Sequence, residues 1–437
     1  MMTMFCYIFF LTPLMFLSMN WVLLQSSILL IFIYFVVQNF YNFFSGISYM
    51  FGMDMVSYSL ILLSFLISSL MIISMVRDSN MNSFIIVNMG LLLMLLVIFS
   101  SLSFLYMYVS FEFVLVPLLI LIMGWGYQPE RLMAGMYMFF YTLFFSVPLL
   151  MLIIYMYSCM GCLFFDYLGK IYSMFFLIHF ILIVVFLVKL PMYFVHFWLP
   201  KAHVQAPVSG SMILAGLMLK IGGYGIIRTM LFFEELFIKY SFIWFSFSMV
   251  GSLFISFICL IQGDMKSLIA YSSISHMGLV IMGLMTMTSW GLLGSYLLML
   301  GHGFCSSGLF YMANLLYLRT GSRSFYITKG LMMYLPSCSL FMFLLCSFNM
   351  SCPPSLNFIS EFMILSSMIS YWFWSLIFFV GISFFCACFS YYLYSFSQHG
   401  LFHNLYSFSN LNVVEYLCLM IHLVPLIFIP TILGSLF

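Results

Sequence analysis

Four charged residues lie deep inside apolar segments of this chain: Glu112, Lys189, Lys220 and Glu361. A charge near the middle of a bilayer-spanning helix costs about 2.5–3.5 kcal/mol, so the four together cost on the order of 10–14 kcal/mol unless something offsets them. Pairing or local hydration must therefore compensate. Buried carboxylates and amines of this kind are typical of proton relays. The alternative is a lysine that reaches the membrane surface or pairs structurally.

Glu112 and Lys189 are the candidates for an ion pair that opens and closes. Contact between the two side chains would favour both charged forms. Separation would favour loss of the lysine proton, because desolvation disfavours a buried ammonium. A purely structural pairing would use the same contact, and the sequence does not separate the two interpretations.

Lys220 is followed by Ile-Gly-Gly-Tyr-Gly. Glycine has no side chain, so we expect these glycines to weaken the helix just beyond the lysine and to let another backbone or water approach. Tyr224, four residues on, would share a helix face with Lys220. The glycine spacing is not that of a dinucleotide-binding fingerprint.

His276 and His302 are candidates for carrying a proton between these charges. Each lies in an apolar segment that also holds serine, in AYSSISHMG and LGHGFCSSG respectively. Histidine changes charge near neutral pH and can pass a proton along a hydrated chain. A structural donor role is the alternative for each histidine, and their spacing does not indicate a haem site.

Glu361 is the candidate for releasing the proton, with neutralisation of a neighbouring cation as the alternative. At the opposite end of the path, His196, Lys201 and His203 could bring protons in, or could simply be solvated at the surface. Asp264 and Lys266 are expected to form an ordinary loop pair. Such a pair would carry no function.

The elements that hold these residues must be transmembrane helices. The chain is 66% hydrophobic and 5% charged, whereas soluble domains carry about 25% charged residues. Apolar stretches of about 20 residues recur throughout, so we predict an all-α polytopic membrane protein with about fourteen transmembrane helices. We see no secretory signal or transit peptide. A net charge of +2 does not favour a nucleic-acid partner, and the 11 cysteines form no metal-binding framework.

Two of the predicted helices are interrupted by proline, one at Lys189-Leu190-Pro191 and one at 351–354. Proline breaks the hydrogen-bond ladder of a helix, and a membrane tolerates this where the break is buried in protein or lines a cavity. Two broken helices five spans apart predict an internal repeat of inverted topology. The predicted organisation is 1–83 for helices one to three, 84–230 for the first repeat, 241–394 for the second, and 395–437 for a loop and the last helix.

The distribution of basic residues predicts the orientation. With the N-terminus outside, the inner loops hold Arg77, Arg131, Lys201, Lys266, Arg319, Arg323 and Lys329, and the outer side holds Lys170, Arg228 and Lys239. Seven against three places both termini outside under the positive-inside rule.

Four stretches carry a resemblance to a known family. They are GWGYQPERL at 124–132, HFWLPKAHVQAPVSGSMILAGLMLKIGGYG at 196–225, DMKSLIAYSSISHMG at 264–278 and SFSQHG at 395–400. Through them the chain resembles the chain 4 family of mitochondrial NADH–ubiquinone oxidoreductase, respiratory complex I. The resemblance covers nearly the whole chain, and the long central motif is highly specific.

The resemblance implies an antiporter-like, proton-pumping subunit with fourteen helices and inverted five-helix repeats. The residues that match the family's relay are Glu112 of helix five, Lys189 at the break of helix seven, Lys220 of helix eight, Glu361 of the broken helix twelve, and His276 and His302 on the central hydrophilic axis. Two positions depart from the family pattern. Gln205 stands where relatives commonly have glutamate, and Ser360 stands where glycine is usual.

The resemblance also implies location and partners. The chain would lie in the mitochondrial inner membrane, with both termini on the intermembrane-space side, as one subunit of an H⁺-translocating NADH:ubiquinone reductase. Its partners would be the other membrane-arm subunits, among them the sister antiporter-like chains 2 and 5, together with accessory subunits and membrane lipids. No cofactor is expected in this chain: NADH, FMN, iron–sulfur clusters and ubiquinone would belong to partner subunits.

Two other functions remain open at this point. A stand-alone or multi-subunit cation/proton antiporter would share the broken helices and buried lysines, but a cation site favours buried carboxylates beyond Glu112 and Glu361. A structural spacer in the membrane arm would tolerate neutralisation of all the buried charges.

Overall fold

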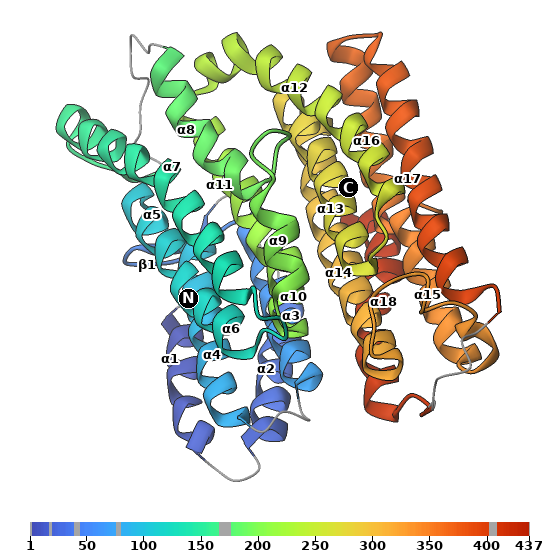
Figure 1. Ribbon diagram of the computed structural model, residues 1–437. Helices are drawn as coiled ribbons and strands as arrows, with labels where there is room; N and C mark the ends of the chain where they lie inside the picture. The colour runs from blue at the N-terminus through green and yellow to red at the C-terminus, as the bar shows by residue number, and fades with distance from the viewer. Residues whose placement is uncertain are drawn as a thin grey trace. The chain divides into compact units, whose positions relative to one another are not determined.

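The protein is almost entirely helical in the computed structural model, which describes residues 2–16, 20–38, 44–75, 80–165, 176–401 and 409–436. Figure 1 shows the helices coloured along the chain. The chain divides into two compact units. The first is Met1–Lys189 with Gln205–Lys239, and the second is Leu190–Val204 with Tyr240–Phe437.

The first unit contains most of the elements before residue 233. They are α1 (Met2–Phe10), a 3₁₀ turn (Thr12–Phe16), α2 (Asn20–Val36), β1 (Ser45–Ser48), β2 (Phe51–Met53), α3 (Met55–Ser74), α4 (Met81–Ser100), α5 (Phe104–Phe113), α6 (Leu115–Trp125), α7 (Arg131–Met160), α8 (Phe176–Lys189), α10 (Val208–Ile213), a π-helical turn η2 (Leu214–Met218) and α11 (Leu219–Phe232). Helix α8 packs on α7 and α11, and α3 packs on α2, α4 and α10.

The second unit is a helical bundle formed largely by the C-terminal half of the chain. Its elements are α9 (Trp198–Gln205, of which Gln205 belongs to the first unit), α12 (Glu234–Ile261, whose first residues belong to the first unit), α13 (Met265–Met285), α14 (Ser289–Thr320), a 3₁₀ turn (Leu331–Met333), α15 (Pro336–Asn349), α16 (Leu356–Tyr371), α17 (Ser375–Gln398) and α18 (Val413–Leu436). Helix α14 lies at the centre, packed on α13, α15, α16 and α18.

The helices have the length and composition of membrane spans. In the described part of the chain, nine helical segments are long and apolar enough to cross a membrane, and four shorter apolar helices accompany them. A helix of 20 residues covers the hydrocarbon core of a bilayer. The protein is therefore a helical, multi-pass membrane protein, as the composition predicts.

Both breaks predicted at proline are present. Helix α8 ends at Lys189, and the next helix, α9, begins only at Trp198. Helix α15 ends at Asn349 and α16 begins at Leu356, with Ser351 in the left-handed backbone region at φ 61°. An L-residue other than glycine is uncommon in that region, so the surrounding structure must hold this break in place.

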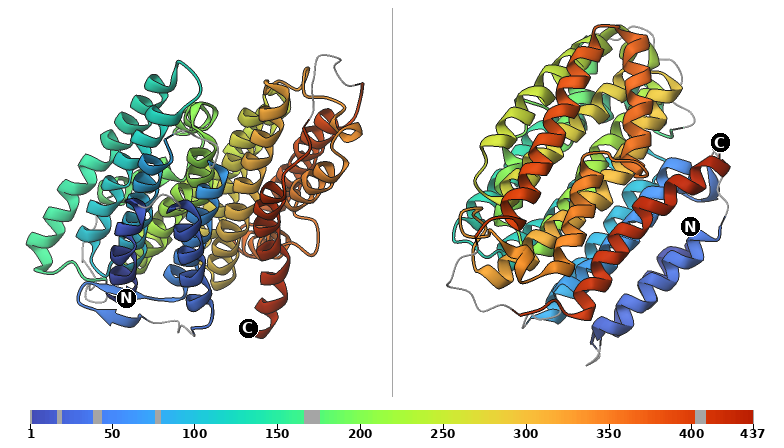
Figure 2. Two further views of the ribbon diagram at one scale, coloured as in Figure 1. Left: turned by 90° about the horizontal axis from the view of Figure 1, so that it is seen from below. Right: turned by 90° about the vertical axis from the view of Figure 1, so that its right-hand side faces the viewer.

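A short β-hairpin, which the sequence analysis did not predict, precedes α3. Strands β1 and β2 pair antiparallel (Figure 2). The ring centroid of Phe51 lies 4.8 Å from that of Phe5 in α1. The hairpin leads directly to Asp54, the N-cap of α3. Its carboxylate accepts a hydrogen bond from the Ser57 backbone, and the Ser57 hydroxyl closes the capping box.

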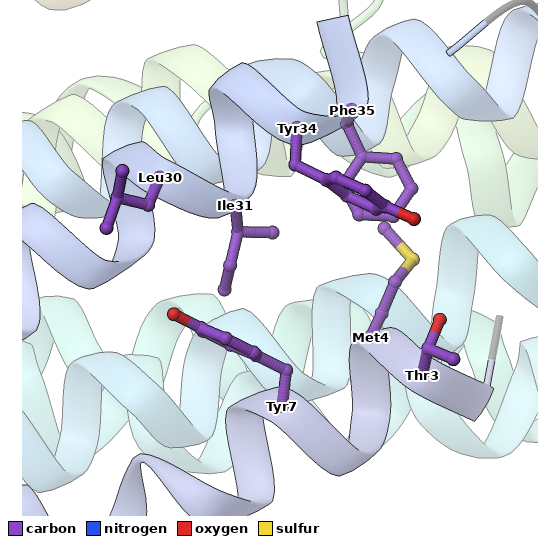
Figure 3. A pocket seen from close by; sticks show the side chains of 7 residues that line it. All are labelled: Thr3, Met4, Tyr7, Leu30, Ile31, Tyr34 and Phe35. Atoms are coloured by element: carbon purple, nitrogen blue, oxygen red, sulfur yellow. The ribbon is translucent and has the colours of Figure 1, made fainter. Parts of the chain in front are cut away.

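An apolar hollow of about 360 Å³ lies between α1 and α2 (Figure 3). It is lined by Thr3, Met4 and Tyr7 of α1 and by Leu30, Ile31, Tyr34 and Phe35 of α2. No charged group lines it, so it takes no part in positioning the candidate relay.

A buried ion pair ties the hairpin end of α3 to α11. The Arg228 guanidinium meets the Asp54 carboxylate in two contacts of 2.7 and 2.8 Å, and only 2% of Arg228 is exposed. The Tyr224 ring lies 4.7 Å below the guanidinium. The positive-inside prediction counts Arg228 among the cations of the outer side. This is wrong for Arg228 as a loop cation, because it is buried and paired with Asp54 inside the fold. Arg77 and Lys170, also used in that count, lie outside the described residues.

This pair determines the charge state of Asp54. Burial acts to raise the pKa of the carboxyl group, but the Arg228 guanidinium and the Ser57 hydrogen bonds outweigh burial and hold the pKa below its usual range. A depressed carboxyl pKa contributes stability that is present above the unfolded-state pKa and is lost as the pH falls through the folded-state pKa. The pair is therefore intact at neutral pH.

We expect Asp54→Asn to destabilise the protein by about 3–5 kcal/mol at neutral pH, because it leaves the Arg228 charge buried without its partner. The measurement is thermal unfolding of the protein in mild detergent. Asp264→Asn is the matched control, since Asp264 is an exposed N-cap residue that makes no side-chain capping bond. Equal melting temperatures for the two variants would contradict a stabilising role of the pair.

Candidate functional site

Glu112 and Lys189 occupy two helix ends of the first unit. Glu112 is the penultimate residue of α5, next to the turn at Val114 that separates α5 from α6, and Lys189 is the last residue of α8. The two groups interact electrostatically. The Ser146 hydroxyl also interacts with the Glu112 carboxylate, but no direct hydrogen bond joins Glu112 to Lys189 in the described part of the chain. Glu112 and Lys189 are therefore close enough to interact electrostatically, but they do not form a direct ion pair.

The Lys189 ammonium lies against an aromatic ring instead. Its Nζ atom is 4.6 Å from the centroid of Phe111, the neighbour of Glu112, and 1% of the lysine is exposed. A cation over a ring face gains part of the stabilisation that a carboxylate would supply. The Phe111 ring therefore stabilises the Lys189 ammonium at a position beside Glu112. This position suits an ion pair between Lys189 and Glu112 that forms and breaks.

Lys220 follows the π-helical turn η2 by two residues. It is fully buried, and its Nζ atom donates to the carbonyl of Ala215 at 2.5 Å. A π turn shifts the backbone hydrogen-bond pattern and is frequent at functional sites. The irregularity thus lies before Lys220. Helix α11 continues through all three glycines.

The glycines after Lys220 serve packing. A Cβ at Gly225 would collide with the ring of Phe186 from α8, so this glycine lets α8 and α11 approach closely. Tyr224 contacts residues other than Lys220. Its hydroxyl donates to the carbonyl of Phe99 at 3.0 Å, and its ring underlies Arg228.

In the second unit, three predicted residues come together. His276 of α13 has its Nδ1 atom 3.7 Å from Oε1 of Glu361 in α16. The His302 ring of α14 lies 5.6 Å from the His276 ring, centroid to centroid. All three side chains are buried. This histidine–glutamate cluster is a set of proton-exchanging groups within one helical bundle, in the yellow and orange part of Figure 1.

Close helix packing creates the cluster. A Cβ at Gly294 would meet the backbone of Ser360, and one at Gly301 would meet the carboxamide of Asn357. Small residues on α14 thus let α16 approach, as is common between membrane helices. Ser360 lies at this contact, and its hydroxyl donates to the Asn357 carbonyl at 2.7 Å.

Cys386 of α17 also belongs to this cluster, although the sequence analysis did not name it among the candidate site residues. Its Sγ atom is 3.4 Å from Nε2 of His276 and donates to the carbonyl of Asn349 at 3.5 Å. The thiol therefore links the end of α15 to the ring that faces Glu361. No spacing in the sequence signals this contact, because the cysteine and the histidine are 110 residues apart.

The residues proposed for proton uptake have different environments. His196 is stacked against Phe197, with ring centroids 4.4 Å apart, and His203 is stacked on Phe310 at 4.6 Å. Both histidines are buried, whereas Lys201 is exposed. Surface solvation is therefore wrong for the two histidines. Gln205 donates to the Glu130 carboxylate at 3.1 Å.

Lys266 is another buried cation of the second unit. It lies in the first turn of α13 and is 1% exposed, near the Arg323 side chain that donates to the Val204 carbonyl at 2.7 Å. Asp264 is exposed. The expected loop pair is therefore wrong, because helix α13 begins before Lys266 and carries it into the protein.

The arrangement suits proton transfer better than metal binding. Among the described residues, no three histidine, cysteine, aspartate or glutamate side chains are placed to hold a metal ion. The polar groups are instead spread through the interiors of the two units. Each unit holds groups that can exchange a proton: Glu112, Lys189 and Lys220 in the first, and His276, His302 and Glu361 in the second.

Comparison with known proteins identifies the family. A family model described as NADH:quinone oxidoreductase/Mrp antiporter matches residues 101–390. A second, described as the amino terminus of NADH–ubiquinone oxidoreductase chain 4, matches residues 1–98. The chain 4 protein of Ceratitis capitata is 47% identical, with 95% of each chain covered. The chain belongs to the NADH–ubiquinone oxidoreductase chain 4 family.

Other members of the chain 4 family agree. The chain 4 protein of Aedes aegypti is 48% identical over 90% of this chain and 88% of its own length, and that of Locusta migratoria is 46% identical over 96% of both. The resemblance found in the sequence motifs is thus confirmed. Animal relatives also fit a mitochondrial origin.

Solved structures share the fold at low identity. A chain of respiratory complex I from Thermus thermophilus superposes with a TM-score of 0.89 at 22% identity, covering 98% of this chain and 94% of its own. A chain of an archaeal membrane-bound sulfane sulfur reductase superposes with a TM-score of 0.83 at 17% identity, covering 96% and 74%. At such identities the likeness concerns the fold alone.

We expect His276 and Glu361 to act as one unit in proton transfer. His276→Gln and Glu361→Gln should each lower proton pumping by the assembled complex, and the double variant should be no worse than the more severe single one, because groups that act as a unit are not additive. The measurement is the number of protons pumped per electron, with the substitutions made at the matching positions of a tractable bacterial relative.

His422→Gln is the matched control for this cycle. His422 is a fully buried histidine of the same unit, but its Nδ1 atom contacts the Cys418 carbonyl at 2.7 Å, away from Glu361. Pumping should survive this substitution. Strictly additive losses for the His276 and Glu361 variants would contradict a shared step.

Proposed function

We infer that this chain is a proton-translocating membrane-arm subunit of respiratory complex I, the H⁺-translocating NADH:ubiquinone reductase. The observation that carries this conclusion is a pair of buried lysines, Lys189 and Lys220, inside a chain that matches the chain 4 family along nearly its whole length. Ionised groups inside membrane helices are too costly to persist without a use.

The proposed organisation assigns membrane crossings and repeats to the helices described above. We propose about fourteen membrane crossings, with helices four to eight (84–230) and nine to thirteen (241–394) as inverted repeats, residues 1–83 as three preceding helices and 395–437 as a loop and the last helix. Support comes from the two observed breaks, at 190–197 and 350–355, which fall in the seventh and twelfth of these crossings.

The proposed setting is the mitochondrial inner membrane, with both termini on the intermembrane-space side. The partners are the other membrane-arm subunits, among them sister antiporter-like chains 2 and 5, with accessory subunits and membrane lipids. The redox steps with NADH, FMN, iron–sulfur clusters and ubiquinone belong to partner subunits. The orientation is supported by the basic residues Arg131, Lys201, Arg319 and Lys329, which are assigned to the inner side.

The proposed mechanism begins at the open pair of the first unit. A charge shift in the neighbouring subunits changes the contact between Glu112 and Lys189. When the contact breaks, the Lys189 ammonium loses the charge that favours its protonated form and gives up its proton. The proton is passed on through Lys220, a fully buried lysine whose Nζ atom donates to the Ala215 carbonyl.

The second unit completes the path. The proton reaches the His276 and His302 rings and then the Glu361 carboxylate, which lies 3.7 Å from Nδ1 of His276. Glu361 releases it toward the intermembrane space. Each step moves one proton between a donor and an acceptor and changes no redox state, so this chain needs no cofactor for its part.

A cation/proton antiporter is the alternative function, and the surroundings of the other buried carboxylates disfavour it. Asp54 is paired with Arg228, and Glu415 is paired with Arg319 at 2.6 Å. Neither carboxylate is available to bind a metal cation.

One prediction concerns the assembly of this chain into the complex. In a native separation of mitochondrial membranes in mild detergent, this chain should co-migrate with the high-mass band that stains for NADH dehydrogenase activity. Migration as a small free species, together with sodium-dependent proton flux, would instead favour the antiporter.

Another prediction concerns the two buried lysines, Lys189 and Lys220. Lys189→Met or Lys220→Met should slow proton transfer through this chain by about 10²-fold or more, because a positioned acid–base group contributes at least that much. The complex should then pump fewer protons per electron. The measurement is made on an assembled complex of a bacterial relative with the matching substitution, and Lys239→Met, an exposed lysine, is the control.

Unchanged stoichiometry in both lysine variants would overturn the relay assignment. If neutralising Glu112, Lys189, Lys220 and Glu361 together also left pumping intact, the chain would be a structural spacer.

A further inference from the structure

A hollow of about 480 Å³ lies at one end of the second unit, between the loop after α14 and the end of α17. The side chains that matter for its chemistry are Phe325, Lys329, Tyr392, Ser395, Phe396 and His399. This volume is in the usual range for small-molecule sites. The hollow is remote in sequence from every residue of the proposed relay.

The hollow lies at the depth of the membrane surface. Helix α12 ends at Ile261, α13 begins at Met265, α14 ends at Thr320 and α17 ends at Gln398, and the loops that follow these ends form the hollow. Helices of more than 20 residues cross the hydrocarbon core, so their ends lie among the lipid headgroups. Ile261 is 82% exposed, and Phe396 is 50% exposed. An apolar surface thus leads from the hollow toward the hydrocarbon.

This end of the unit is also its basic end. All five lysines and arginines of the second unit belong to it: Lys201, Lys266, Arg319, Arg323 and Lys329. Glu415 is occupied by Arg319. No carboxylate is among the residues that line the hollow, and the nearest in sequence is the exposed Asp264, which is bridged to Ser324 through the backbone. The local charge therefore favours an anion over a cation.

A backbone hydrogen bond holds the polar side chains of the hollow close to one another. The Gly330 amide donates to the His399 carbonyl at 3.1 Å, which fixes the loop that carries Lys329 against the end of α17. Helix α17 adds the hydroxyl groups of Ser395 and Tyr392. The mouth thus combines an exposed ammonium, an imidazole and hydroxyl donors, which are the groups that bind a phosphate ester.

Aromatic rings form the apolar wall. The Tyr392 and Phe396 rings are 4.3 Å apart, and the Phe325 ring lies 5.4 Å from Tyr392 and 6.4 Å from Phe396. Rings at this depth contact the glycerol region and the first methylene groups of a lipid. A soluble anion would make no use of this wall.

We propose that this hollow binds an anionic phospholipid, with its phosphate at Lys329 and His399 and its acyl chains along Phe396 and Ile261. Basic pockets between membrane helices are the usual sites for such headgroups. The proposal does not depend on proton transfer, and lipid retention is measured separately from pumping. An acidic peptide of a partner subunit is the competing occupant.

The first test is native mass spectrometry of the purified, assembled complex. The wild type should retain one anionic phospholipid that Lys329→Gln holds about fivefold less well, because one lysine near a membrane surface contributes about that factor. His399→Gln should weaken the same lipid. Lys239→Gln, an exposed lysine elsewhere in the chain, should retain it fully. Equal retention in Lys329→Gln and the wild type would overturn the proposal.

A second test uses the wild-type complex, so it does not depend on assembly of a variant. The delipidated complex is incubated with phosphatidylglycerol that carries a photoactivatable acyl chain, and the cross-linked peptides are sequenced. Cross-links to the peptides holding Ile261 and Phe396, suppressed by excess phosphatidylglycerol but not by phosphatidylcholine or inorganic phosphate, are expected. Equal suppression by phosphatidylcholine or by phosphate, or a partner-subunit peptide seated in the hollow, would overturn it.

Discussion

The cost of keeping an ionised group away from water governs this structure. Several buried charges in the described part of the chain are stabilised, and the arrangements differ. Arg228 is paired with Asp54, and Arg319 is paired with Glu415. Lys220 donates to the Ala215 backbone carbonyl, and the Lys189 ammonium lies against the Phe111 ring beside Glu112. The first two arrangements are stable structural ties, whereas the last two leave a charge that can move.

Helix discontinuities provide the places where such charges are tolerated. Glu112 lies at the end of α5, Lys189 ends α8, Lys220 follows a π turn, and Glu361 lies in the second turn after the break between α15 and α16. A regular membrane helix uses all its backbone groups internally, but an interrupted one leaves carbonyl and amide groups for side chains and water. The position of each candidate residue is therefore tied to a backbone feature as well as to its own chemistry.

The two units use different chemistry. The first relies on the buried amines of Lys189 and Lys220. The second gathers two imidazoles, a carboxylate and the Cys386 thiol, which pack because glycines of α14 admit α16. A lysine responds strongly to the charge beside it, and a histidine passes protons near neutral pH. Such a division suits a device in which one part senses a charge shift and the other conducts the proton.

The sequence by itself determined the membrane class, the two proline breaks and the family, and it proposed the candidate relay residues. These depend on local features, namely long apolar stretches, isolated charges and contiguous motifs. Only the tertiary structure decided which groups meet. Asp54 and Arg228 are 174 residues apart, Cys386 and His276 are 110 apart, and the burial of Lys266 depends on where α13 begins. Hydropathy records how apolar a stretch is, but not which neighbour its polar side chains face, because that depends on how separate helices pack.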